Sequence, residues 1–421
     1  MGKASRNVYV FSVISCLCLS TSCGIFAPES DHDFTYRNVP PVIQSITASS
    51  TYLEIQPDGT VDSTLITVSA NDENNDKLSY TFSVPVGSLS ALSDTTAFFH
   101  PPPTPGAYYV TCFVSDGSLH TTAMIKITVY PSEANSKIAF TSNGDIYTIK
   151  PDGTDKTRLT ITGARFPSWS PDGTEIVYIT TENFDYGNIS IMNSDGSNQR
   201  QITSTGMDSN PSWSPDGAKI VFMSRREGYE DIYVMNADGT DQTLLYEGSL
   251  RDWYPRWSPD GTRIAFLSER YPPHLTCLCV MNADGSDFRE VEPEETISDV
   301  SGEYTIHTFE WSPDESEFVY ALQIDYFYYL SSVFIMNIDG SEVVQLPHFY
   351  SASMVGAYPT WSPSGSRIAY TGDAIDVGYD KGSSIEGYIN IYIINRDGTG
   401  REELTKNYGS YVEMSWSPVI R

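Results

Sequence analysis

The chain has 421 residues, enough for two or three domains, and a formal net charge of −29. A surface this acidic repels phosphate backbones, which argues against nucleic acid as a partner. Only 19 % of the residues are charged, whereas 28 Tyr and 18 Phe occur in short runs broken by Asp-Gly and Pro, a composition that predicts an all-β protein.

The N-terminus has the pattern of an export signal. Lys3 and Arg6 precede an apolar run at residues 8–19, and small residues follow it up to Cys23. The run is too short to span a bilayer permanently, so residues 1–22 are expected to be a signal peptide.

Small residues before a cysteine resemble the bacterial lipobox, and this resemblance implies that Cys23 carries a lipid and becomes the mature N-terminus. Cys16 as the lipidated residue and a plain secretory signal are the alternatives. Gly24 after the cysteine implies an outer-membrane location, on either the periplasmic or the cell-surface side. The polar residues 23–39 are expected to form a tether.

Residues 40–131 contain short apolar segments separated by turn residues, and about seven strands in this length predict an immunoglobulin-like β-sandwich. The segment is similar to PKD- and cadherin-like modules of bacterial surface proteins. Its acidic loop at residues 71–76 offers oxygen ligands that could bind Ca²⁺, although such a loop is more often merely solvated. No other cofactor is expected.

Residues 135–421 consist of an internal repeat. Trp-Ser-Pro recurs at intervals of 44 to 55 residues, and a Pro-Asp-Gly turn, a strand, a variable loop, a second strand and an Asp-Gly turn usually follow it. Four strands per repeat of this length predict a blade of a β-propeller. The repeated tryptophans are Trp169, Trp213, Trp257, Trp311, Trp361 and Trp416.

The two ends of the repeat region complement each other. The first unit, from Lys137, lacks a Trp-Ser-Pro strand, and residues 412–418 supply such a strand without the rest of a unit. Joining them gives six units, so we expect the C-terminal strand to complete the first blade and close a six-bladed ring.

The repeat, with WSPDG followed by DIYVMNADG, resembles that of TolB and the wider TolB-like propeller family over residues 135–421. The resemblance implies a binding propeller in the cell envelope. TolB has a small α/β domain before its propeller, where this chain has the expected sandwich. The role of TolB in the Tol–Pal system therefore does not transfer to this chain.

The variable loops share one face of the expected propeller, and exposed aromatic residues gathered there would form a hot-spot surface. We expect this face to bind a protein of the envelope or cell surface; a glycan is the alternative, because sugars also stack on aromatic rings. The expected binding residues are Tyr186, Tyr229, Trp253, Tyr254, Tyr326, Phe327, Tyr328, Tyr329, Tyr350 and Tyr358.

Sequence signatures of enzymes are missing. Residues 382–386 fail the nucleophile-elbow pattern at the last position, and no HExxH, P-loop or dinucleotide motif occurs. His274, His307 and His348 could approach one another on the variable face and hold a metal ion, which leaves a metal-dependent propeller enzyme as a second alternative. We therefore expect that this protein is not an enzyme.

Overall fold

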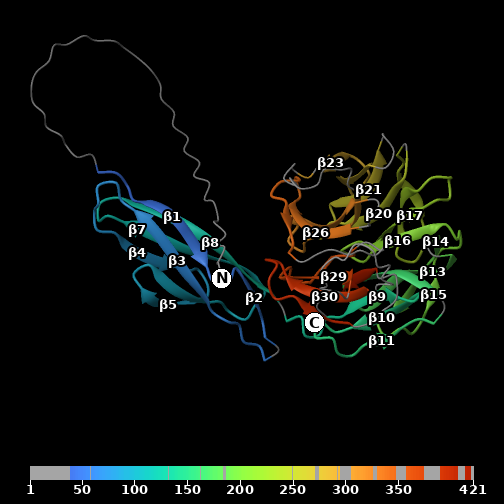
Figure 1. Cartoon of the computed structure of the whole chain (residues 1–421), viewed down its shortest axis with the longest axis horizontal. Helices are drawn as coiled ribbons and strands as arrows, with labels where there is room; N and C mark the ends of the chain where they lie inside the picture. The colour runs from blue at the N-terminus through green and yellow to red at the C-terminus, as the bar shows by residue number, and fades with distance from the viewer. Residues whose placement is uncertain are drawn as a thin grey trace, which may run out of the picture. The chain divides into compact units, whose positions relative to one another are not determined.

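The computed structural model describes residues 38–56, 58–130, 132–161, 163–183, 186–248, 250–270, 275–291, 293, 305–325, 330–347, 357–373, 389–405 and 413–418. Every regular element in these ranges is a β-strand, as expected from the composition (Figure 1). They contain no helix long and apolar enough to cross a membrane. The chain divides into two compact units, with the boundary between Ser132 and Glu133.

The first unit contains two four-stranded sheets. One has the order β1 (Val42–Ala48), β3 (Thr64–Asn71), β6 (Thr96–His100), β5 (Ser88–Ser93), and the other β2 (Tyr52–Glu54), β8 (His120–Tyr130), β7 (Gly106–Ser115), β4 (Ser79–Ser83). All neighbours are antiparallel except β2 and β8.

Alternating side chains of the two sheets form one core. In β8, for example, Ile125, Ile127 and Val129 are buried while the residues between them face outward. They pack with Ile66 of β3 and Val110 of β7 in a single hydrophobic cluster. The period of two is typical of strands with one buried and one solvated face.

The second unit is built from strands that follow the repeat. Its first sheet has the order β11 (Thr157–Arg158), β10 (Asp145–Ile149), β9 (Ile138–Ser142), β32 (Met414–Trp416). The following repeats form β12 (Ala164–Trp169), β13 (Glu175–Asn183), β14 (Tyr186–Asn193), β15 (Arg200–Gln201), then β16 (Asp208–Trp213), β17 (Lys219–Ser224), β18 (Asp231–Asn236), β19 (Thr243–Tyr246).

The same strand order continues to the end of the chain. The later repeats form β20 (Asp252–Trp257), β21 (Arg263–Arg270), β22 (Leu275–Asn282), β23 (Arg289–Val291), then β24 (Thr305–Trp311), β25 (Glu317–Asp325), β26 (Leu330–Asn337), β27 (Val344–Gln345), and finally β28 (Thr360–Trp361), β29 (Arg367–Asp373), β30 (Ile389–Asn395), β31 (Glu402–Glu403).

The strands that end at a repeated tryptophan form a closed cycle. Taken in the order β12, β16, β20, β24, β28 and β32, each contacts the next, and β32 contacts β12. β32 pairs antiparallel with β9, with Trp416 opposite Ile138. This pairing confirms the expectation that the C-terminal strand completes the first sheet.

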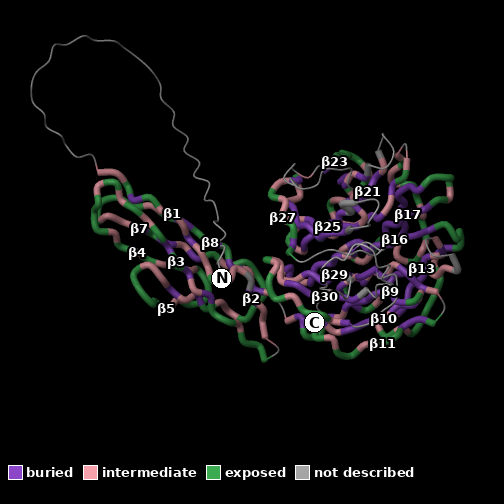
Figure 2. Tube along the Cα trace, viewed as in Figure 1, coloured by how far each residue is buried: buried purple, intermediate pink, exposed green. Residues whose placement is uncertain are grey.

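The repeated tryptophans pack between neighbouring repeats. Trp213 of β16 contacts a cluster that includes Val177 and Ile191 of the preceding repeat. The indole Nε1–H of Trp169 in β12 donates to the carbonyl oxygen of Ser415 in β32 at 3.2 Å, so a polar contact joins the first sheet to the next repeat. Because each sheet is covered on both faces, strands such as β9 are buried along their whole length (Figure 2).

Candidate functional site

A pocket of about 510 Å³ opens among the variable loops of three consecutive repeats. Its walls come from the start of β14, the loop between β17 and β18, the connection from β19 to β20, and the end of β21. The lining residues are Tyr186, Arg225, Gly228, Tyr229, Glu230, Leu250, Arg251 and Glu269.

Glu230 forms the buried base of this pocket. Its side chain is 7 % exposed; Oε1 accepts a hydrogen bond from the Tyr186 hydroxyl, and Oε2 lies 3.2 Å from Arg251 Nε. Burial alone would raise the pKa of Glu230, but the hydrogen bond from Tyr186 and the charge of Arg251 outweigh it and lower that pKa. Burial, and then the Glu230 carboxylate, raise the pKa of Tyr186. Glu230 therefore remains ionised and holds one side chain from each neighbouring repeat.

Arg225 and Tyr229 form the exposed rim of the pocket. Tyr229 is 66 % exposed, and the Arg225 guanidinium lies 5.8 Å from the centre of the Tyr186 ring. The backbone between them is constrained, because the Gly228 N–H donates to the Arg225 carbonyl at 3.1 Å and Gly228 has φ +114°. That φ favours glycine, so the turn presents both rim side chains from a fixed backbone.

Asp231, next to Glu230 at the start of β18, was not among the expected site residues. It is 3 % exposed, and its Oδ1 is buried without a hydrogen-bond partner. Burial, followed by the charges of Glu247, Glu230 and Glu227, raises its pKa to about 6. Asp231 is the first residue of the repeated DIYVMNADG segment, whereas Glu230, just before it at the end of the variable loop, belongs to no recognisable motif.

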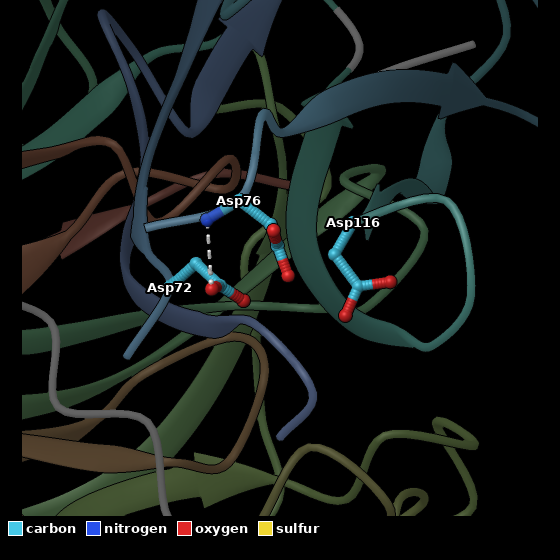
Figure 3. Close-up of side chains that lie close together, drawn as sticks. All are labelled: Asp72, Asp76 and Asp116. Carbon is cyan, nitrogen blue, oxygen red and sulfur yellow. Dashed lines mark hydrogen bonds between the residues drawn. The ribbon is translucent and has the colours of Figure 1, made fainter. Parts of the chain in front are cut away.

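Three carboxylates of the first unit also lie together. Asp72 and Asp76 come from the loop between β3 and β4, and Asp116 from the turn between β7 and β8 (Figure 3). One oxygen atom from each lies within 4.8 Å of the others. Asp72 Oδ1 accepts the Asp76 N–H at 3.1 Å, while Asp72 Oδ2 is buried without a partner.

Carboxylate oxygens are ligands that Ca²⁺ prefers, so the three acids offer a plausible donor set for that ion. The sequence pointed to the loop at residues 71–76, and the structure adds Asp116 from a turn 40 residues further along the chain. Binding of Ca²⁺ stays a prediction. Calorimetric titration with CaCl₂ should give heat with the whole chain and none with the Asp72→Asn variant.

Comparison with known families identifies the repeat. The family model described as the TolB beta propeller domain matches residues 109–228 and 205–374, together well over half of the chain. This chain belongs to the TolB β-propeller domain family. No curated protein matches it as a sequence relative.

Two solved TolB structures are similar to this chain. TolB from Acinetobacter baumannii is 16 % identical and superposes with a TM-score of 0.55, covering 80 % of this chain and 83 % of that one. A putative TolB from Agrobacterium tumefaciens is 18 % identical, covering 68 % and 99 %, with a TM-score of 0.49. At such identities the Acinetobacter structure shows a shared fold, and the ligand must be argued from the site itself.

Within this TolB-family propeller, the pocket brings together two of the expected binding residues, Tyr186 and Tyr229. Trp253 is half-buried beside it, with the Arg251 guanidinium 5.7 Å from its ring. Tyr358 is also half-buried and packs against the cluster that contains Trp416, away from this pocket.

The expectation of an exposed Tyr254 is wrong. Its residue is only 5 % exposed, and its ring lies 5.8 Å from that of Phe309 in the core. The physical reason is a register shift in β20 between Trp253 and Arg256, where Tyr254 has φ +59° and the strand no longer alternates regularly.

Several expected residues lie outside the part of the chain that the structure describes. This applies to the lipidation site, to most of the later aromatic residues and to two of the three histidines, of which only His307 is described. The residues outside the described ranges are Cys23, Tyr326, Phe327, Tyr328, Tyr329, Tyr350, His274 and His348.

Proposed function

We propose that this chain is a non-enzymatic lipoprotein of the bacterial cell envelope whose propeller binds a protein partner through the variable-loop face. The pocket at Glu230 carries the proposal. Its exposed Tyr229 ring stands beside a buried, fully bonded Glu230 that fixes Tyr186 and Arg251. Exposed aromatic and arginine side chains on a rigid support are typical of binding hot spots.

The proposal includes a specific architecture. The cyclic contacts from β12 to β32 support six blades, and the two facing sheets of the first unit support an immunoglobulin-like sandwich at residues 40–131. In the proposed protein this sandwich separates the lipid anchor from the propeller along the chain.

The proposed location is the outer membrane, through a lipid on Cys23. The basic and apolar N-terminus and the membership of the TolB propeller family support export to the envelope. Metabolic labelling with an alkyne fatty acid should modify the wild-type chain and leave the Cys23→Ala variant unlabelled. Labelling of the Cys23→Ala variant would show that another residue carries the lipid.

A cross-linked pull-down from native envelopes tests the binding function. The bait is the whole mature chain, compared with a Tyr229→Ala/Arg225→Ala variant of the pocket rim. Tyr109→Ala is the matched control, because Tyr109 is a 47 % exposed tyrosine of the first unit. We expect the wild type and the Tyr109→Ala control to retain one envelope protein that the rim variant loses. Equal recovery by all three baits would remove protein binding from this face.

Carbohydrate binding is the second candidate, favoured by the same exposed Tyr229 ring. Sugars stack on such rings, and the pocket volume of about 510 Å³ is in the range of small-molecule sites. A glycan array probed with the wild type and with Tyr229→Ala separates the two candidates. Signals that depend on Tyr229, together with an empty pull-down, would favour the glycan.

A further inference from the structure

The charged side chains of the pocket are not equivalent. Glu230 already accepts from Tyr186 and pairs with Arg251, so it has little capacity for a ligand. Elsewhere in the propeller arginines pair closely with acids: Arg226 lies 2.9 Å from Asp208, and Arg367 contacts Glu133. In this acidic chain, a cation without such a partner therefore stands out.

Arg225, which lines the pocket, has no such partner in the part of the chain that the structure describes. Among the described residues no carboxylate lies within 4.0 Å of it, and its side chain makes one long hydrogen bond, from Nε to the Gly228 carbonyl at 3.4 Å. The residue is exposed and lines the pocket. A guanidinium has five donors in a planar fork that matches a carboxylate, so most of its donor capacity is open to a ligand.

The surroundings make this guanidinium a usable binding group. Its backbone N–H donates to the Met207 carbonyl at 2.9 Å, which anchors the start of the turn. Its guanidinium lies over the Tyr186 ring, and that ring is held in turn by Glu230. These contacts place the guanidinium beside the Tyr186 ring at the rim of the pocket.

We infer that Arg225 is the anchor of a carboxylate subsite in this pocket, and that the carboxylate belongs to a peptide segment of the partner protein. The inference rests on the proposed protein-binding function and names the chemistry that this function recognises. The carboxylate forms a bidentate pair with Arg225, while neighbouring apolar atoms of the segment pack on the exposed Tyr229 ring.

The overall charge favours a peptide over an acidic polysaccharide. A polyanion approaching a chain of net charge −29 is repelled along its whole length. A peptide segment with one or two carboxylates is repelled only near those groups. Sugar hydroxyls also require several hydrogen-bonding groups, and the Glu230 carboxylate and the Tyr186 hydroxyl are already bonded to each other.

Random peptide libraries test the subsite on the whole mature chain. One library is displayed with blocked C-termini, so that only Asp and Glu supply carboxylates; a second, synthetic library has free C-termini and no acidic side chains. Enrichment in the first assigns a side-chain carboxylate, and enrichment in the second a C-terminal one. We expect that peptides selected from one of the two libraries lose binding when their carboxylate is converted to an amide.

Affinities of the selected peptides, measured by fluorescence anisotropy, then locate the contact. Arg225→Ala should weaken binding about 10- to 100-fold, and Arg225→Lys should restore part of the loss. Arg289→Ala, which removes an exposed arginine of the outer strand β23, is the matched control and should change nothing. A double-mutant cycle should show that the Arg225→Ala and peptide-amide effects are not additive.

Three outcomes would overturn the inference, and they can be told apart. Selected peptides that lack carboxylates would refute the subsite and leave the protein-binding face intact. The same holds for peptides whose affinity is unchanged by Arg225→Ala but reduced by Tyr229→Ala. No selected peptide from either library would refute the subsite, and the pull-down then decides separately whether this face binds a protein. Sodium glucuronate that binds in an Arg225-dependent manner without any peptide would assign the subsite to a sugar acid.

Discussion

Two neighbouring acids at the start of β18, Glu230 and Asp231, lie in different environments. Glu230 is buried but bonded on both carboxylate oxygens, and its pKa is lowered. Asp231, the next residue, is buried without a partner for Oδ1, and its pKa is raised. A buried charge without a partner destabilises a fold, whereas a paired one is tolerated, so the two residues should respond in opposite ways to loss of charge.

Asp231→Asn should stabilise the propeller at pH 8. Because the folded state raises this pKa from 3.8 to about 6, the folded state binds more protons between pH 4 and 6, and stability falls as pH rises through that window. Asp231→Asn avoids this loss of stability, so it should raise the free energy of unfolding at pH 8 by about 1 kcal/mol after allowance for solvent screening. Urea denaturation at pH 8 and pH 4 measures the difference, which should vanish at the lower pH.

A turn aspartate provides the matched control. Hydrogen bonds from the Ser214 side chain and the Ala218 backbone lower the pKa of Asp216, so its contribution to stability is present above pH 4 and is lost as pH falls. Asp216→Asn should therefore destabilise the protein at pH 8. If Asp231→Asn also destabilised it there, the buried carboxylate would have to be paired.

At the scale of the element, the Ser-Pro-Asp-Gly turn recurs with one set of contacts. Ser214 Oγ donates to Asp216 Oδ1 at 2.5 Å and accepts the Lys219 N–H at 2.9 Å, while Gly217 has φ +70°. The last repeat has Ser364 in place of the aspartate. There Ser364 Oγ takes over the aspartate's contacts, because it lies 2.9 Å from Ser362 Oγ and accepts the Ser366 N–H at 3.1 Å. The buried Glu133, from outside the repeat, accepts the Ser364 N–H at 3.1 Å.

One repeat keeps the turn at a cost. Glu315 occupies the glycine position with φ +60°, a conformation that costs a residue with a Cβ about 1 kcal/mol or more. Glu315→Gly should therefore raise the free energy of unfolding by about 0.5–1 kcal/mol, even though it removes the long, partly exposed ion pair with Arg263.

Chemical denaturation of Glu315→Gly and of Glu315→Ala checks this prediction. The alanine variant also loses the ion pair but keeps the strained backbone, so it should be no more stable than the wild type. Equal effects of the two substitutions would mean that the backbone strain is negligible.

At the scale of the whole molecule, the ring is closed by residues from both ends of the second unit. β32 supplies Trp416 to a cluster with Ile138, Phe140 and Ile391. The Trp416 indole donates to Ser136 Oγ at 2.8 Å, and Ser417 and Lys137 exchange two further hydrogen bonds. Without β32, the edge of β9 would lose its partner and the ring would be open.

Deletion of residues 412–421 should therefore destabilise the propeller by at least about 3–5 kcal/mol, the typical loss for one buried tryptophan. Differential scanning calorimetry of the whole chain should show a lower melting temperature for the propeller transition. Deletion of residues 419–421 alone keeps β32 and is the control. Identical melting of the two truncated chains would mean that β32 does not hold the ring together.

Contacts between residues close in the sequence were predictable, whereas most contacts between distant residues were not. Turns were predictable because their contacts join residues within five positions, as in Ser214 to Lys219. The pairing of β32 with β9 was also predictable, since each end of the repeat region lacks what the other provides. The hydrogen bond from the Ser364 N–H to Glu133 was not predictable, because that contact joins residues 231 positions apart.

The all-β class, the repeat and its family were predictable from the sequence, because period and turn chemistry are local properties of the chain. Which side chains face solvent and which contact each other depends on the folded chain: Tyr229 is exposed while Tyr254 is buried, and Glu230 joins Tyr186 to Arg251. The reason is physical. A strand pattern indicates which residues alternate, but a bulge reverses that alternation, and a pocket forms from loops that only the closed ring brings together.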